Sequence, residues 1–333
     1  MISNNSLQKL LWITWFITAT STCCLAGEKT KVEIRSSLDG SQQPCYVILP
    51  RSYSGRDTRV PLLVSLHSWS AGLEQARPEM EKQVEKLGWI YLYPHFRGPN
   101  QNPQACGSLL AQQDILDAVI WAKQHYRIDH SRVYLTGVSG GGHMTMLMAG
   151  RHPDVWTAAS AWVGISDLEK WHARHKQSRY GDMMRKSCGG APGTNAKIDA
   201  QYKARSPIGF LHRAAKLPVD IAAGIHDGHI GSVPISHSLL AFNQIASATD
   251  DPLISTLEIK QLSTPTGRLS HPKPSDQKPD AVLGRDIYLR RYAGASRVTI
   301  FEGGHEGNTA AALDWLKRFR RLEDGRIIDE SKK

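Results

Sequence analysis

The chain has 333 residues, of which 41% are hydrophobic and 22% are charged. This length suits one large domain or two small ones, and the composition excludes a chain that is disordered throughout. The formal net charge is +10, but Lys and Arg are scattered without a tight run, so there is no nucleic-acid signature. A basic surface can attract acidic polymers or anionic membranes, yet the scatter favours a soluble basic protein without such a role.

The first 26 residues differ from the rest of the chain. Lys9 precedes the apolar stretch 10–17, and small and polar residues then lead to Ala26. This order is typical of a secretory signal peptide cleaved after Ala26. It predicts a secreted or periplasmic protein with no stable membrane anchor after cleavage. The apolar stretch is short for a membrane span, and an uncleaved N-terminal anchor is the alternative interpretation.

From residue 27 onward, β-type apolar runs alternate with helical patterns, and the turn at Asp39-Gly40 joins the first two runs into a hairpin. Strands are predicted at 32–35, 45–49, 62–66, 89–93, 133–136, 158–162, 219–224 and 298–301. Helices are predicted at 74–87, 109–125, 140–150, 234–245 and 309–322. Because this alternation requires crossover connections, it predicts an α/β fold with a mostly parallel central sheet flanked by helices, plus an antiparallel N-terminal hairpin.

Two segments interrupt the alternation. Residues 166–216 contain aromatic residues and a glycine-rich turn, while residues 250–285 are rich in Pro, Ser, Thr and Lys and lack clear periodicity. We expect the first segment to cover part of a site, and the second to be an irregular loop inserted into a single domain spanning 27–322. The charged tail 323–333 is expected to be frayed.

Three cysteines remain once the predicted signal peptide is removed. They are Cys45, Cys106 and Cys188. In an oxidising compartment, one disulfide and one free thiol is the simplest arrangement. Cys106 and Cys188 both precede glycines in loop-like contexts, and we predict that they form the disulfide. No Cys-x-x-Cys metal pattern occurs, and we expect neither a metal nor a cofactor.

A candidate nucleophile, Ser139, lies in the sequence Gly-Val-Ser-Gly-Gly at 137–141. This G-x-S-x-G pattern directly follows the strand predicted at 133–136 and precedes a helix. A sharp strand-to-helix turn needs small neighbours to hold the serine outward, and the helix start directs backbone N–H groups at a developing anion. The alternative is a glycine-rich turn that only joins a strand to a helix.

A serine hydroxyl needs a base, and the base needs an acid to orient it. His305 follows the last predicted strand and is flanked by glycines, so we predict that it is the base. Asp227 follows the strand at 219–224 and is the predicted acid, with Asp167 as the alternative. His226 and His229 beside Asp227 lack partners at metal-ligand spacing, so we interpret them as loop residues.

An oxyanion hole needs two preset N–H donors. The predicted donors are the amides of Gly140, next to the nucleophile, and of Trp69, in the loop 67–70 after an early strand. The indole of Trp69 is either a core ring or a surface that stacks on substrate. Trp162, Trp171 and His172 are candidates for the substrate pocket, with a plain core position as the alternative for Trp162.

The residues at 67–69 and 137–141, together with the later Asp227 and His305, resemble the α/β-hydrolase superfamily. More closely, the chain resembles the prolyl oligopeptidase-type catalytic domain (peptidase family S9). It is also similar to secreted esterases such as feruloyl esterases, acetylxylan esterases and polyhydroxybutyrate depolymerases. The resemblance covers about residues 30–322 and implies a serine nucleophile, an aspartate acid and a histidine base at these positions. Ser68 departs from the usual pattern, because the family commonly has His-Gly where this chain has His67-Ser68.

Acyl transfer to Ser139 followed by hydrolysis is the predicted reaction. Fewer than about forty residues precede the hydrolase strands, whereas the oligopeptidases place a propeller domain there. The sequence therefore favours a carboxylic ester over a peptide as substrate, either a small molecule or an ester linked to a polysaccharide. A serine-type peptidase and a non-catalytic hydrolase-fold binding module are the alternatives. We expect no nucleic-acid partner, and the sequence does not predict an oligomeric state.

Overall fold

The structure is a computed structural model that describes residues 27–55 and 58–332. The predicted signal peptide 1–26 lies outside the described residues, and the expected secreted or periplasmic location stays a prediction. Within the two described ranges, no helix is both long enough and apolar enough to cross a membrane.

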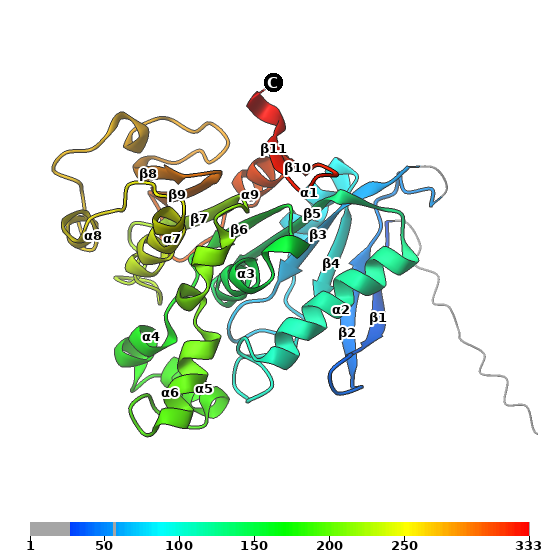
Figure 1. The fold of residues 1–333 in the computed structure, drawn as a ribbon, viewed down its shortest axis with the longest axis horizontal. Helices are drawn as coiled ribbons and strands as arrows, with labels where there is room; N and C mark the ends of the chain where they lie inside the picture. The colour runs from blue at the N-terminus through cyan, green and yellow to red at the C-terminus, as the bar shows by residue number, and fades with distance from the viewer. Residues whose placement is uncertain (1–26, 56–57, 333) are drawn as a thin grey trace, which may run out of the picture.

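The described chain builds a central sheet of nine strands in the order β1-β2-β4-β3-β5-β6-β7-β9-β8 (Figure 1). The strands are β1 (Lys29–Arg35), β2 (Gln42–Ile48), β3 (Val60–Leu66), β4 (Ile90–Pro94), β5 (Ile128–Val138), β6 (Ala158–Trp162), β7 (Val219–Gly224), β8 (Ile287–Ala293) and β9 (Ser296–Phe301). Strands β4, β3, β5, β6, β7 and β9 run parallel, whereas β1, β2 and β8 are antiparallel to their neighbours. The predicted mostly parallel sheet with an antiparallel hairpin is confirmed.

Helices cover both faces of the sheet. One face packs against α2 (Leu109–His125), α3 (Gly140–Arg151) and α7 (Ser236–Ala248), and the other against α1 (Pro78–Leu87) and α9 (Thr309–Leu316) (Figure 1). Strands β4, β6, β7 and β9 are therefore buried at every residue, as expected for parallel strands covered on two sides. Strand β1 at the edge instead alternates exposed and buried residues.

The segment 166–216 leaves the sheet after β6 and forms a group of helices, which lies below the sheet in Figure 1. Its main helices are α4 (Leu168–His175), α5 (Arg179–Cys188) and α6 (Ala196–Arg205). These three helices share their own buried cluster. The segment 250–285 is mostly irregular, as predicted, apart from a short 3-10 turn and the helix α8 (Thr256–Leu262), which a Ser255–Glu258 capping box starts.

Two predictions near the C-terminus were wrong, and one strand was not predicted. The last helix ends at Leu316, not at 322, and the chain continues as β10 (Phe319–Arg321), paired with β11 (Ile327–Asp329). The tail is therefore a hairpin rather than a frayed end. A hydrogen bond from the Tyr134 hydroxyl to the Phe319 carbonyl attaches this hairpin to β5 of the central sheet. Strand β8 was also missed, because its sequence lacks the clean apolar run of its partner β9.

The predicted disulfide between Cys106 and Cys188 is absent, because both residues are free thiols in the structure. They nevertheless lie in the same buried cluster under α4 to α6. Burial raises the pKa of Cys106 to about 11 and also raises that of Cys188. Both side chains therefore stay protonated and pack as small apolar groups.

Three buried histidines should make the free energy of unfolding depend on pH. Burial lowers the pKa values of His67, His143 and His237 from 6.5 to about 4. Between about pH 6.5 and 4 the unfolded chain binds more protons than the folded one, so the free energy of unfolding falls as the pH drops through this window. The loss amounts to roughly 3 kcal/mol for each histidine. Urea unfolding at pH 7 and pH 4.5 measures it.

A matched pair of variants isolates one of these histidines. Nδ1 of His237 accepts from the backbone N–H groups of Ser166 and Asp167, at 3.2 and 3.3 Å, so it must be unprotonated in the folded state. His237→Gln should reduce the pH dependence of unfolding by up to one proton, whereas His271→Gln at an exposed position should leave it unchanged. Equal effects of both variants would contradict this account.

Candidate active site

Ser139 lies at the turn between β5 and α3, as the sequence predicts. Its backbone has φ 62° and ψ −117°, a conformation that costs a non-glycine residue about 1–3 kcal/mol. Neighbouring backbone holds it there, because Ser139 N donates to the Trp162 carbonyl at 2.8 Å and His143 N donates to the Ser139 carbonyl at 2.9 Å. The turn projects the hydroxyl outward from the carboxyl end of β5.

The glycines around Ser139 leave room for neighbouring backbone. A β-carbon at Gly137 would lie 2.4 Å from the backbone of Gly141, and one at Gly141 would lie 2.3 Å from the carbonyl oxygen of Leu66. Real β-carbons essentially never approach so closely, and these neighbours are backbone atoms with little freedom to shift. Packing at this strand-to-helix turn, which we call the elbow, therefore requires glycine at both positions.

Ser139, His305 and Asp227 form a continuous hydrogen-bonded relay. Nε2 of His305 lies 2.8 Å from Oγ of Ser139, and Nδ1 lies 2.7 Å from Oδ2 of Asp227. Asp227 is 1% exposed, and its other oxygen accepts from the backbone N–H groups of Gly228 and Val233 at 2.9 and 3.0 Å. An ionised Asp227 therefore keeps the proton of His305 on Nδ1, which leaves Nε2 free to accept the serine proton.

The alternative acid lies outside this relay. Asp167 caps the start of α4, where its side chain accepts from the backbone N–H of Lys170 at 3.1 Å. His226 contacts Glu302 at 2.7 Å, and His229 is exposed. Within the described ranges, no three His, Cys, Asp or Glu side chains are grouped to hold a metal ion.

The two predicted oxyanion donors lie side by side. A β-carbon at Gly140 would lie only 2.1 Å from the backbone nitrogen of Trp69, so the loop after β3 touches the start of α3. Backbone N–H groups at such a point can face the oxygen of a bound carbonyl group. Their role as oxyanion donors stays a prediction.

Sequence reasoning missed the side chains that hold the loop after β3. The hydroxyl of Ser68 donates to the Val138 carbonyl at 3.3 Å and accepts from Arg77 at 3.0 Å. Gln75 accepts from the Ser68 backbone N–H at 2.9 Å and from Arg77 at 2.9 Å. Ser68, where the family commonly has glycine, therefore links the loop to the strand that carries Ser139. The departure from the family pattern was the signal available in the sequence.

The aromatic residues predicted near the site are mostly interior. The Trp69 indole is 2% exposed and packs edge-on against Trp171, with ring centres 4.6 Å apart, which agrees with the core alternative. Trp171 is 1% exposed and donates to the Ser232 carbonyl, and His172 is also buried. Packing inside the helical segment accounts for these contacts, and a place for Trp171 and His172 in the substrate pocket stays a prediction.

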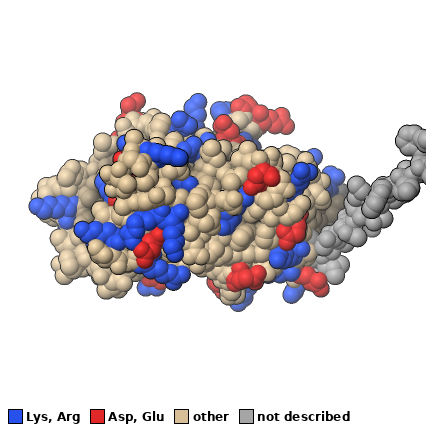
Figure 2. Space-filling view, turned by 90° about the horizontal axis from the view of Figure 1, so that it is seen from below, with Lys and Arg blue, Asp and Glu red and all other residues tan. Residues whose placement is uncertain are grey.

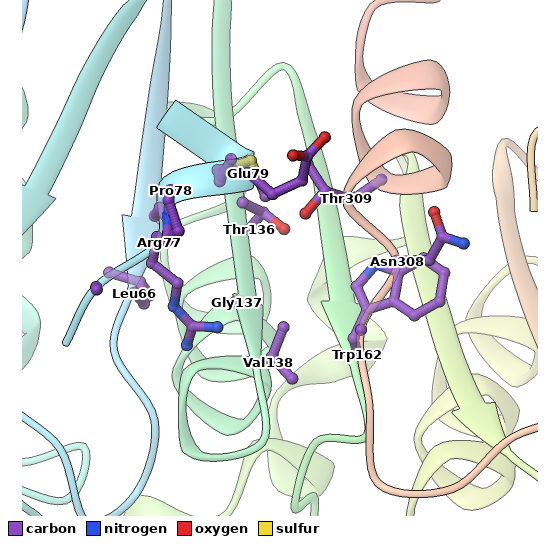
Figure 3. A pocket seen from close by; sticks show the side chains of 15 residues that line it. Leu66, Arg77, Pro78, Glu79, Thr136, Gly137, Val138, Trp162, Asn308 and Thr309 are labelled. Atoms are coloured by element: carbon purple, nitrogen blue, oxygen red, sulfur yellow. The ribbon is translucent and has the colours of Figure 1, made fainter. Parts of the chain in front are cut away.

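A cavity of about 260 Å³ opens beside the relay, between the starts of α1 and α9 (Figure 3). Val138 and Gly307, which closely flank Ser139 and His305 in the chain, line it together with Trp162. The Arg77 side chain points into this space in Figure 3. Trp162 is thus the one candidate pocket residue that reaches this cavity, while its indole N–H donates to Ser160 at 2.8 Å. Ser139 and His305 themselves do not line it.

Comparisons with known proteins give one family match and several distant relatives. A family model described as the prolyl oligopeptidase family matches residues 79–258. Feruloyl esterase B of Thermothelomyces thermophilus is 27% identical over 163 residues, covering 45% of this chain and 53% of that protein. Acetylxylan esterase of Coprinopsis cinerea is 28% identical over 122 residues, covering 32% of each. An uncharacterized peptidase, YtmA of Bacillus subtilis, is 26% identical over 166 residues, covering 49% of this chain and 61% of that protein.

Solved structures show the same fold. Acylaminoacyl peptidase of Pyrococcus horikoshii superimposes with a TM-score of 0.56 at 19% identity, covering 68% of this chain and 36% of that one. The sheet order and this likeness establish an α/β-hydrolase fold. The match spans less than two thirds of the length of each of these relatives.

Proposed function

Because the chain belongs to the prolyl oligopeptidase family, we propose that it is a serine hydrolase that uses Ser139, His305 and Asp227 to cleave a carboxylic ester. The observation that carries this proposal is the relay itself, with contacts of 2.8 and 2.7 Å on the two sides of one imidazole. Binding alone would not require a nucleophile, a base and a buried acid in one line, so the relay argues against a non-catalytic module.

The relay supports a two-stage reaction. His305 Nε2 removes the Ser139 proton as Oγ attacks the ester carbonyl carbon, and the imidazolium that forms is stabilised by Asp227. The amides of Gly140 and Trp69 would stabilise the negative oxygen of the tetrahedral intermediate. His305 then protonates the departing alcohol, leaving an acyl group on Ser139. Water, deprotonated by His305, hydrolyses this acyl-enzyme and restores the serine.

The names of the relatives, which include feruloyl and acetylxylan esterases, favour an ester over a peptide as the substrate of this protein. Peptide hydrolysis is the second candidate, because the matched family and the superimposable structures are named as peptidases. One triad serves both bond types, so the substrate has to be decided by assay.

A substrate panel separates the two candidates. The purified protein should hydrolyse p-nitrophenyl acetate and methyl ferulate, and kcat/KM for a proline p-nitroanilide should be at least 100-fold lower. The Ser139→Ala variant corrects for background hydrolysis in every assay. Turnover of the anilide alone would overturn the ester assignment and favour the peptidase.

A further inference from the structure

Positive charge is concentrated in the helical segment 166–216. It holds eleven Lys and Arg against four Asp and Glu, which gives a net charge of +7 within a chain whose total is +10. The sequence pattern shows no tight run because these residues are spaced along the whole segment, most of them in the helices α4, α5 and α6. The fold brings these helices together, so residues that are scattered along the chain become neighbours on one part of the surface.

Six exposed cations form what we call the basic face: Arg174, Lys176, Arg179, Lys186, Lys197 and Lys203. None of the six has an ion pair with any other described residue, whereas Lys170 and Arg185 in the same segment pair with Asp167 and Asp182. Figure 2, which looks at the molecule from below, shows Lys and Arg gathered around one acidic group at the left of this side, whereas acidic and basic groups are interspersed over the rest of it. Unpaired charges at this density repel one another and favour a multivalent anion.

The basic face is joined to the loop that holds the predicted catalytic acid. Arg174 donates to the carbonyl of Gly228, directly after Asp227. His175 contacts the carbonyl of Ser232 at 2.7 Å, and Ser232 directly precedes Val233, whose backbone N–H donates to Asp227. Helix α4, which carries Arg174 and His175, also supplies Trp171, which packs on Trp69 of the proposed oxyanion loop. A polymer bound along these helices would therefore lie beside the relay.

The chemistry of this surface identifies one class of partner. The large hydrophobic side chains that are exposed among the described residues all lie outside 166–216, so the basic face offers nothing to insert into a bilayer. Its nearest aromatic ring, Tyr180, is half-buried and packs against Trp171 and His175, so it is not free to stack on a nucleic-acid base. What it offers is long, flexible cationic side chains spread over several helices, which fits a hydrated chain with repeated negative groups.

We propose that the basic face binds an anionic polysaccharide, bearing carboxylate or sulfate groups, and thereby presents its ester substituents to Ser139. This inference rests on the proposed ester hydrolase function. Binding should be electrostatic, and so it should weaken as salt screens the charges.

The test uses the full protein with three charges reversed: Arg179→Glu, Lys186→Glu and Lys197→Glu. Arg179 and Lys197 lie in the first turns of α5 and α6, where acidic residues are favourable, so the variant should fold. The matched control reverses three exposed lysines elsewhere, Lys82, Lys86 and Lys278, which gives the same change in net charge.

Affinity electrophoresis in polygalacturonate and in dextran sulfate distinguishes carboxylate from sulfate recognition, with neutral xylan as the reference. We expect the basic-face variant to bind the preferred anionic polymer at least 10-fold more weakly than the wild type, and the control variant to bind within 2-fold of it. Equal weakening in both variants would overturn the inference. Tighter binding to DNA or to phosphatidylserine vesicles than to either polysaccharide would also overturn it.

Turnover separates this inference from the proposed function. Both triple variants should hydrolyse p-nitrophenyl acetate at the wild-type rate, because neither touches the relay. The basic-face variant alone should lose kcat/KM on acetylated polygalacturonate, by about 10-fold, and not on neutral acetylated xylan. If no ester is hydrolysed but charge-selective polymer binding persists, the hydrolase proposal fails and the binding surface stands. If esters are hydrolysed without such binding, the surface inference fails alone.

Discussion

Replacing Ser139 with alanine should lower kcat/KM for p-nitrophenyl acetate by about 10⁴-fold or more, while the free energy of unfolding stays within about 1 kcal/mol of the wild type. The loss follows because no other described hydroxyl contacts Nε2 of His305. Folding should survive, since alanine keeps the backbone contacts of the elbow and removes only Oγ. Steady-state kinetics and urea unfolding measure the two quantities.

Ser247→Ala is the matched control for this variant. Ser247 is exposed on α7, and its replacement should change activity by less than 2-fold. If the Ser139→Ala protein kept more than a tenth of the wild-type kcat/KM in a folded state, the nucleophile would have to be another residue.

Asp227→Asn should reduce kcat/KM by about 10⁴-fold with little change in geometry. Oδ1 of Asp227 accepts from two backbone N–H groups, so an asparagine would direct its carbonyl oxygen there and its NH₂ group towards His305. The imidazole would then have to accept at Nδ1 and carry its proton on Nε2. In that tautomer it cannot take the serine proton, and the base is lost.

Asp167→Asn is the matched control, because Asp167 is the alternative acid from the sequence. It caps α4, and asparagine is also a good cap, so activity should fall by less than 3-fold. Kinetics of the two variants side by side decide between the carboxylates. A larger loss for Asp167→Asn than for Asp227→Asn would reverse the assignment of the acid.

The sequence predicted the central part of the fold well because its strands are short buried runs. Helix 109–125 and the strands at 158–162 and 219–224 match the structure residue for residue. Helix α1 starts at Pro78, later than predicted, at a position that suits proline in a first helical turn. The edge strand β8 and the C-terminal hairpin were missed because pairing with distant strands, and not local pattern, stabilises them.

The relay could be predicted because its three members follow strand ends in a fixed chain order, and the geometry of parallel strands brings those ends together. The contacts of Ser68 with Gln75, Arg77 and Val138 could not be predicted from the sequence, because they depend on how the loop after β3 folds back. The sequence also could not show that Cys106 and Cys188 are not bonded to each other. Both residues lie in one buried cluster, so their local sequence context does not distinguish a disulfide from two free thiols.

Labelling with a fluorophosphonate, followed by peptide mapping, tests the central claim most directly. The probe phosphonylates only a serine that a neighbouring base activates. The folded wild-type protein should take up one phosphonate per chain, on Ser139, and the His305→Ala variant should label at least 100-fold more slowly. A folded wild-type protein that remained unlabelled, or that carried the phosphonate on a different residue, would contradict the assignment of Ser139 as the nucleophile.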